Sequence, residues 1–387
     1  MVDVRRDAIY GSCQGDMIIT TGISRRSVLA GGAAFAVLAA CDRSSGGANG
    51  TVHVYNWSDY IAPDTLKRFE AETGIRPVYD VYDSNEILEA KLNLGRSGYD
   101  VVFPSATPNF AREVKAGRFR ELDRALIPNA AELDHKILAQ LAGVDAGNRH
   151  GLPYLMSATG IGFNRKAVEG LIPADRRDSL AMLFDPAIVT RLQKCGVSLL
   201  DDAIDVFPAA LAFAGRDPKS LSEADLRAAG EIVQRARPHY RYFHSSSYIN
   251  DLANGEICVA QGWIGDLVQA RDRASEAGHG VEIEIVIPRE GAPFNIDVMA
   301  IPVDAPHPEN AHRLINFLLQ PDVIGSISNA VGYANAVPAA RAHMEAGIAS
   351  DPAIYPPAST PLYVPPVAPA DYERSRNRLW TQIKSGV

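Results

Sequence analysis

Two aromatic rings and a carboxylate lie within the five residues Asn56-Trp57-Ser58-Asp59-Tyr60. The apolar segment before them, residues 51–55, reads as a strand. The faces of aromatic rings attract an ammonium group, and a carboxylate neutralises its charge. This composition is typical of a binding site for a small organic cation. A polar loop that Trp57 and Tyr60 anchor to the domain explains the same residues about equally well.

Carboxylates and one further ring follow two later apolar segments, residues 196–200 and 259–262. The residues concerned are Asp201, Asp202, Asp205, Trp263 and Asp266. An aspartate that follows a strand most often caps the next helix, and a single tryptophan most often packs in the core. Asp297 differs, because it lies inside the apolar segment 296–302, where a carboxylate needs a partner or a ligand.

Signatures of catalysis are largely missing from the sequence. It contains no Gly-x-Ser-x-Gly motif, no pair of histidines at metal-binding spacing and no glycine-rich phosphate loop. His244 precedes a run of serines, but adjacent residues do not readily form a pair of base and nucleophile. We therefore expect a binding protein that is not an enzyme and needs no cofactor or metal. An exported hydrolase that uses His244 is the alternative.

An alternation of strands and helices must position these residues. The expected strands are residues 51–57, 78–82, 99–103, 160–164, 196–200, 256–262 and 281–287. The expected helices include residues 64–73, 85–95, 223–237 and 372–384. This order predicts an α/β fold with mainly parallel sheets flanked by helices. In such folds ligands bind beyond the carboxyl ends of the strands, where the clusters above stand.

The segment from Thr51 to Val387 is longer than one hydrophobic core usually supports, so we expect two lobes. Two extended segments, residues 152–164 and 285–302, contain small or turn residues midway. Each can cross from one lobe to the other, and together they form a two-strand hinge. The expected bounds are 51–155 with 289–338 for lobe I, and 156–288 with 339–387 for lobe II.

Residues 1–41 carry the features of an export signal. The basic pair Arg25-Arg26 precedes an apolar run over residues 28–40 and then Cys41. The run is too short to span a bilayer and matches the hydrophobic region of a signal peptide. Arg25-Arg26 resembles a twin-arginine signal. Leu38-Ala39-Ala40-Cys41 resembles a bacterial lipobox, whose cysteine is lipidated after cleavage.

The expected signal peptide is residues 17–41, and residues 42–50 form a flexible linker. The mature protein is therefore expected in the periplasm, held at the membrane only by the lipid on Cys41. In this oxidising compartment Cys195 and Cys258, the cysteines outside the signal region, suggest one disulfide. Two separate buried thiols are the alternative.

The chain carries a net charge of −8 at pH 7. A surface of this sign does not attract nucleic acid, so nucleic acid is excluded as a partner. Outside the signal region, no block of lysine or arginine reads as a patch for phosphate or lipid headgroups. An acidic protein favours cations, although only weakly and without specificity.

Five segments resemble the putrescine-binding members of the polyamine-binding proteins of bacterial ABC transporters. They are residues 55–65, 80–88, 241–255, 333–336 and 354–358. The resemblance implies a two-lobed fold like that of type II periplasmic binding proteins. It also implies a monomer that encloses a polyamine between its lobes and delivers it to an ABC permease. A binder of another cation, and a sensor that reports polyamine levels to a membrane partner, are alternatives.

The resemblance also implies roles for individual residues. Rings that stack on the methylenes of the ligand correspond to Trp57, Tyr60, Trp263 and Tyr333. Carboxylates that bind its charged ends correspond to Asp59, Asp205, Asp266 and Asp297. Further ligand-binding positions correspond to Ser58, Ser105 and Asp202, the last of which matches an acidic position of spermidine-binding relatives. The disulfide of the family corresponds to Cys195 and Cys258.

One position departs from the family pattern. Two residues before Asp297, where family members carry an aromatic ring, this chain has Asn295. The adjacent Phe294 faces the other way by strand alternation unless a bulge shifts the register. Asn295 can instead form a hydrogen bond with a polar substituent of the ligand. Agmatine and spermidine are therefore as reasonable as putrescine.

Overall fold

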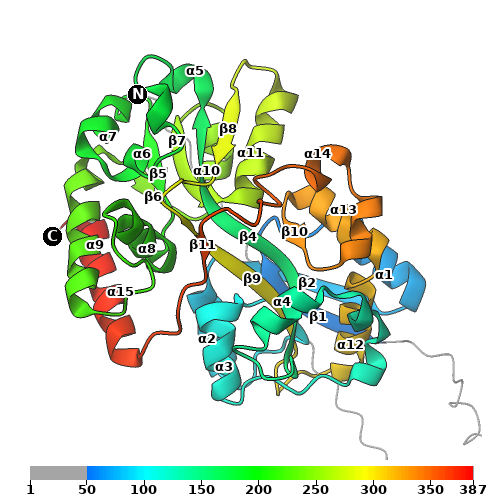
Figure 1. The fold of residues 1–387 in the computed structure, drawn as a ribbon. Helices are drawn as coiled ribbons and strands as arrows, with labels where there is room; N and C mark the ends of the chain where they lie inside the picture. Colours follow the sequence, from blue (N-terminus) through cyan, green and yellow to red (C-terminus); the bar gives the residue numbers. More distant parts are fainter. Residues whose placement is uncertain (1–49, 387) are drawn as a thin grey trace, which may run out of the picture. The chain divides into compact units, whose positions relative to one another are not determined.

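The computed structural model describes residues 50–386, and Figure 1 shows a mixed α/β structure in which helices flank the strands. The expected signal peptide, its lipidation site Cys41 and residues 42–49 of the expected linker lie outside the described residues. Within residues 50–386, no helix is both long enough and apolar enough to cross a membrane.

The strands form one connected set with the order β2-β1-β3-β9-β4-β7-β5-β6, in which β8 and β10 also pair with β4, and β11 with β9. Their bounds are β1 Thr51–Trp57, β2 Arg76–Tyr82, β3 Val101–Val102, β4 Gly151–Asn164, β5 Val197–Leu199, β6 Tyr242–Phe243, β7 Val259–Trp263, β8 Ile283–Val286, β9 Ala292–Ala300, β10 Ala334–Asn335 and β11 Leu362–Tyr363. β1 is parallel to β2 and β3, and β5 is parallel to β6 and β7, as expected. β4 pairs with its neighbours in the antiparallel sense.

The helices cover the faces of these strands (Figure 1). Their bounds are α1 Thr65–Thr73, α2 Asn85–Asn93, α3 Ala111–Lys115, α4 His135–Leu141, α5 Arg165–Val168, α6 Ala181–Phe184, α7 Pro186–Leu192, α8 Ala203–Phe213, α9 Glu223–Ala236, α10 Tyr248–Ala253, α11 Ile264–Ala277, α12 Pro308–Leu318, α13 Pro321–Val331, α14 Ala346–Ala349 and α15 Ala370–Ser385. The predicted helix signals act as expected. Gly74 ends α1 with a positive φ of 70°, and the Ser84 hydroxyl accepts a hydrogen bond from the Ile87 amide at the start of α2.

Strand β4 runs through both lobes. Its residues 151–158 pair with β9, whereas residues 159–164 pair with β7 and β8. The chain crosses back where β8 is followed by β9, so the two crossings expected from the sequence are present. Here lobe I contains β1, β2, β3 and the helices packed on them, and lobe II contains β5 to β8 with theirs. The exact residue bounds of the two lobes stay a prediction.

A disulfide joins Cys195 to Cys258, with 5.3 Å between their Cα atoms. It ties the segment after α7 to the residue before β7, both in lobe II. The alternative of two separate thiols is therefore wrong. The bridge lies next to the strands whose carboxyl ends carry Asp202 and Trp263, so it stabilises the framework on which those side chains stand.

Candidate functional site

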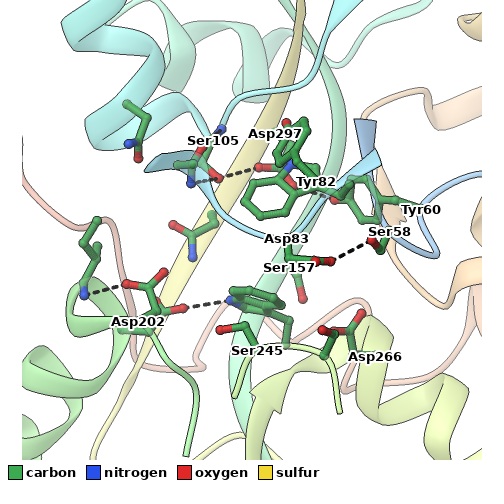
Figure 2. A pocket seen from close by; sticks show the side chains of 18 of the residues that line it. Ser58, Tyr60, Tyr82, Asp83, Ser105, Ser157, Asp202, Ser245, Asp266 and Asp297 are labelled. Atoms are coloured by element: carbon green, nitrogen blue, oxygen red, sulfur yellow. Dashed lines mark hydrogen bonds between the residues drawn. The ribbon is translucent and has the colours of Figure 1, made fainter. Parts of the chain in front are cut away.

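A pocket lies between the two lobes, with about 800 Å³ of space that includes the solvent at its opening. Every ligand-binding residue expected from the sequence lines it: Trp57, Ser58, Asp59, Tyr60, Ser105, Asp202, Asp205, Trp263, Asp266, Asn295, Asp297 and Tyr333. The walls include six aspartates and, among the described residues, no lysine or arginine. Figure 2 shows several of these side chains directed toward a common space. The pocket therefore favours a positively charged ligand.

Asp297 lies on β9 and receives two hydrogen bonds from lobe I (Figure 2). The Ser105 hydroxyl donates to Oδ1 and the Tyr60 hydroxyl donates to Oδ2, each at 2.7 Å. Burial raises the pKa of Asp297 to about 6, although both hydrogen bonds act to lower it. The carboxylate expected to need a partner thus has two, and it keeps lone pairs for a ligand.

Asp266 lies in the first turn of α11, in lobe II. The hydroxyl of Tyr333 donates to its Oδ1 and the hydroxyl of Tyr248 to its Oδ2, each at 2.7 Å. Burial raises the pKa of Asp266 to about 6, while the two phenols act to lower it. Tyr248 also accepts a hydrogen bond from the backbone amide of Trp263. Tyr248 therefore positions both Trp263, the residue before α11, and Asp266 in the first turn of α11.

A glycine allows Tyr333 to reach this position. A Cβ atom placed on Gly265 would lie 1.8 Å from Cδ2 of Tyr333, closer than any two such atoms approach. Tyr333 stands just after α13, whereas Gly265 is next to Asp266 on α11. The absence of a side chain at Gly265 therefore lets the ring of Tyr333 pack directly on α11.

Asp202 and Asp205 stand at the start of α8. Oδ1 of Asp202 caps the helix, as expected, by accepting a hydrogen bond of 2.7 Å from the Ile204 amide. Asp202 also lines the pocket, so the same residue caps α8 and faces the ligand space. Oδ2 of Asp205 accepts a hydrogen bond of 2.8 Å from the Trp263 indole. Burial raises the pKa of both acids, and the charge of Asp205 adds to the rise for Asp202.

Asp59 is the most exposed of the expected acids, and its backbone has a positive φ of 52°. Aspartate tolerates this region better than most residues. The carboxylate lies 3.7 Å from a guanidinium nitrogen of Arg273 on α11, so lobe II approaches it from the side. The neighbouring Ser58 donates a hydrogen bond of 2.7 Å to Asp83, which also lines the pocket (Figure 2).

The rings form two groups around the space. The Trp57 indole donates to the Phe103 carbonyl, and its ring centre lies 6.1 Å from that of Trp263 in an edge arrangement. Tyr60 and Tyr333 form a second edge pair at 4.7 Å. Both tryptophans are only partly buried, so their rings remain available to methylene groups of a ligand.

The wall at Asn295 has no ring. Asn295 lines the pocket, whereas Phe294 does not; Phe294 lines a neighbouring cavity beside Leu141 and Val364, which Asn295 also borders. The register pairs Asn295 with Ser157 and Phe294 with Ala158, and the irregularity in β4 lies elsewhere, between Pro153 and Met156. The expected alternation is therefore confirmed, and no bulge brings Phe294 to the pocket.

Sequence reasoning missed part of the lining. The missed residues are Tyr82, Asp83, Asn85, Thr107, Pro108, Asn109, Ser157, Ile204, Ser245, Ser246 and Ile249. Tyr82 is the last residue of β2, a parallel neighbour of β1, and Asp83 follows it, so the rule that ligands bind at strand ends could have pointed to them. His244, the candidate base, accepts hydrogen bonds at Nδ1 from the backbone amides of Ser246 and Ser247. Nδ1 of His244 therefore stabilises the turn formed by residues 244–247.

Known proteins are similar to this chain in sequence and in fold. Over 341 residues the chain is 45% identical to the putrescine-binding periplasmic protein SpuD of Pseudomonas aeruginosa, which covers 87% of this chain and 93% of the relative. It is also 45% identical over 340 residues to the putrescine-binding periplasmic protein PotF of Escherichia coli, with 87% and 92% covered. The crystal structure of the TpPotD lipoprotein of Treponema pallidum superposes with a TM-score of 0.73 at 27% identity, over 87% of this chain and 99% of that one.

A family match covers most of the segments that build the site. The family described as bacterial extracellular solute-binding protein matches residues 64–356, which include the strands from β2 to β10 and every pocket residue except Trp57, Ser58, Asp59 and Tyr60. The crossing strand β4, and α11 with Asp266, fall within this range. The chain therefore belongs to the bacterial extracellular solute-binding protein family.

Proposed function

We propose that the protein captures a polyamine, putrescine or a close relative, in the pocket between its lobes and delivers it to an ABC permease. The observation that carries the proposal is a pocket walled by six aspartates and aromatic rings, with no basic side chain among its described lining residues. The names of two relatives with 45% identity, both putrescine-binding periplasmic proteins, support the same ligand class.

The energetics of a diamine require both parts of this pocket. Burying four methylenes contributes roughly 3 kcal/mol at about 0.8 kcal/mol each, and micromolar affinity requires about 8 kcal/mol. Charge pairing must supply the remainder. Asp297 stands on β9 and Asp266 on α11, which the proposed bounds place in different lobes, so acids are available on both sides of the enclosed ligand. Closure of the lobes strengthens these pairs because it excludes water.

A triamine such as spermidine is the second candidate. Asp202 and Asp205 form an additional acidic pair at the start of α8, and Asn295 leaves room and a hydrogen-bonding group where a ring is absent. Asp202→Asn should then lower the affinity for spermidine by about tenfold and leave that for putrescine within about twofold. No loss for either ligand would assign Asp202 to capping alone, and equal losses for both would contradict a role specific to the longer amine.

We further propose a monomer in the periplasm, anchored by lipid on Cys41 after export through the twin-arginine pair Arg25-Arg26. The lobe bounds 51–155 with 289–338 and 156–288 with 339–387 belong to the same proposal. The lipoprotein relative from Treponema pallidum supports a lipid anchor. Cys41→Ser should move the protein from the membrane fraction to the soluble periplasmic fraction, whereas Arg25→Lys with Arg26→Lys should retain it in the cytoplasm.

Thermal-shift and calorimetric titrations with putrescine, spermidine, cadaverine, agmatine and neutral amino acids test the ligand class. The proposal requires binding of at least one di- or triamine and none of the amino acids. Turnover of model esters or peptides would instead support the hydrolase that uses His244. Neighbouring genes for a permease and an ATPase would favour transport over a sensing role.

A further inference from the structure

Arg112 of α3 lies between carboxylates that come from different lobes. Its guanidinium forms hydrogen-bonded ion pairs with Glu89 of α2 and with Glu373 of α15. α2 and α3 belong to lobe I, whereas α15 packs on α8 and α9 of lobe II. In Figure 1 the start of α15 comes down toward α2 and α3. The pair of Arg112 with Glu373 therefore connects the two lobes, and neither residue lines the pocket.

The two carboxylates share one cation in a partly buried position. The exposed fraction of the side chain is 35% for Arg112, 18% for Glu89 and 16% for Glu373. Water and salt screen such charges less than those of a fully exposed pair. If Arg112 were absent, Glu89 and Glu373 would face each other as like charges across the lobes. One guanidinium thus converts a repulsion between the lobes into an attraction.

This group of charges also contacts the pocket wall through Asn109. The side-chain amide of Asn109 donates a hydrogen bond of 2.7 Å to Oε1 of Glu89. Asn109 is only 2% exposed and lines the pocket. Its amide oxygen is buried and has no hydrogen-bond partner among the described residues, so it can still accept a donor. The position of Glu89, and with it that of Arg112, therefore depends on a residue beside the ligand space.

We propose that Arg112 is an interlobe latch, a positioning residue that holds the two lobes closed over the pocket without touching the ligand. The affinity of a protein that binds only in its closed form scales with the fraction of molecules that are closed. The effect of the latch on affinity rests on the proposed function, whereas its effect on lobe closure does not. Arg112 therefore sets how tightly the pocket retains a polyamine, in addition to the residues that contact it.

Two substitutions separate the latch from a general loss of structure. Glu373→Gln removes the charge in lobe II and should weaken putrescine binding by about threefold at low salt. Arg112→Met removes the shared cation and should weaken it by about tenfold, because Glu89 and Glu373 are then left unpaired. When Glu373→Gln is added to Arg112→Met, the affinity should rise, since one of two repelling charges is gone. Glu373→Gln thus weakens binding in the parent protein but strengthens it in Arg112→Met. This reversal is expected only if the two carboxylates share one cation.

Arg68→Met is the matched control. Arg68 forms an ion pair of 2.6 Å with Asp322, has a similarly exposed side chain at 32%, and joins α1 to α13. Its loss should leave the affinity within about twofold of the parent protein, because α1 and α13 both fall within the proposed bounds of lobe I and their pair does not connect the lobes. In about 0.5 M sodium chloride the difference between the parent protein and Glu373→Gln should shrink. A Glu373→Gln variant with parental affinity at low salt, or one that weakens Arg112→Met further, would overturn the latch.

Lobe closure itself supplies a second readout that needs no ligand. Small-angle X-ray scattering of the ligand-free protein should give a larger radius of gyration for Arg112→Met than for Arg68→Met. Equal radii would overturn the latch. If no amine binds the parent protein, the proposed function fails, and the scattering result still decides whether Arg112 holds the lobes together.

Discussion

The hydroxyl of Tyr333 donates a hydrogen bond to Oδ1 of Asp266, with 2.7 Å between the two oxygens. Tyr333 follows α13, and Asp266 begins α11 in lobe II, so a ring and an acid of the pocket position each other. Because Tyr248 holds the other carboxylate oxygen, Asp266 has a fixed orientation before any ligand arrives. Preorganised acids of this kind bind a cation without the cost of ordering their side chains.

Removing either central acid should weaken ligand binding strongly. Asp266→Asn and Asp297→Asn keep the side-chain shape but leave an ammonium group without its countercharge. Each should lower the affinity for a diamine at least about tenfold in calorimetric titrations. Asp322→Asn, at a partly exposed acid outside the pocket, is the control and should keep the parental affinity. Parental affinity in both pocket variants would contradict the assigned site.

Binding should depend on pH in the range around 6. Burial raises the pKa of both Asp266 and Asp297 to about 6, so these acids become protonated as the pH falls from 7.5 to 5. The affinity for a polyamine should therefore fall with pH over this range. Calorimetry at pH 7.5, 6.5 and 5.5, with buffers of different ionisation enthalpy, would measure both the loss and the proton release on binding. An affinity that is constant over this range would contradict the pKa shifts.

The same shifts predict how the stability of the ligand-free protein changes. A carboxyl whose pKa is higher in the folded than in the unfolded state binds more protons when folded. Its favourable contribution is complete below the unfolded pKa and is lost as the pH rises through about 6, the folded value for Asp266 and Asp297. A bound polyamine neutralises these charges, so the rise in Tm on adding putrescine should be larger at pH 7.5 than at pH 5.

Asn295→Phe should restore the missing aromatic wall. Asn295 is partly exposed to the pocket on β9, opposite the strand position of Ser157. A ring that packs on methylenes contributes about 0.5–1.5 kcal/mol, so the affinity for putrescine should rise roughly two- to twelvefold. Phe294→Leu is the control, because Phe294 faces a different cavity and its loss should leave the affinity unchanged. Weaker putrescine binding in Asn295→Phe would show that the amide, not a ring, suits this ligand.

Gly265→Ala should displace Tyr333. The added Cβ would lie 1.8 Å from the Tyr333 ring, so the ring or α11 must move and the hydrogen bond to Asp266 is lost. We expect at least about a tenfold loss of affinity, because a charge partner and a wall shift together. Gly347→Ala, where the added Cβ meets no atom within 4 Å, is the matched control. Unchanged binding by Gly265→Ala in calorimetry would separate Tyr333 from the ligand site.

The sequence predicted much of the framework because local signals agree with the fold. The alternation of strands and helices predicted β1, α1, β2 and α2 to within a few residues, and Gly74 and Ser84 end and begin helices as expected. β3 is shorter than predicted, since only Val101–Val102 pairs as a strand. The antiparallel pairing of β4 was not predicted, because pairing direction depends on contacts between distant segments.

The site was predictable where rings and acids follow strands, as at Trp57 and Asp266. The site was not predictable where the strand register or an irregular backbone decides which residues line the pocket. For Tyr82 the strand-end rule indicates only the edge of the sheet; that Tyr82 lies beside Trp57 follows from the register of β2 on β1, which no local pattern fixes. Asn109 lies in an irregular segment after β3, for which strand periodicity gives no signal.

Calorimetric titration with putrescine and with 1,4-butanediol, which has the same methylenes but no charge, tests the central claim most directly. The pocket of six aspartates around aromatic rings predicts that a polyamine from the putrescine and spermidine series binds with micromolar or tighter affinity and that butanediol shows no binding. Equal binding of the diol and the diamine, or no binding of any di- or triamine, would contradict it.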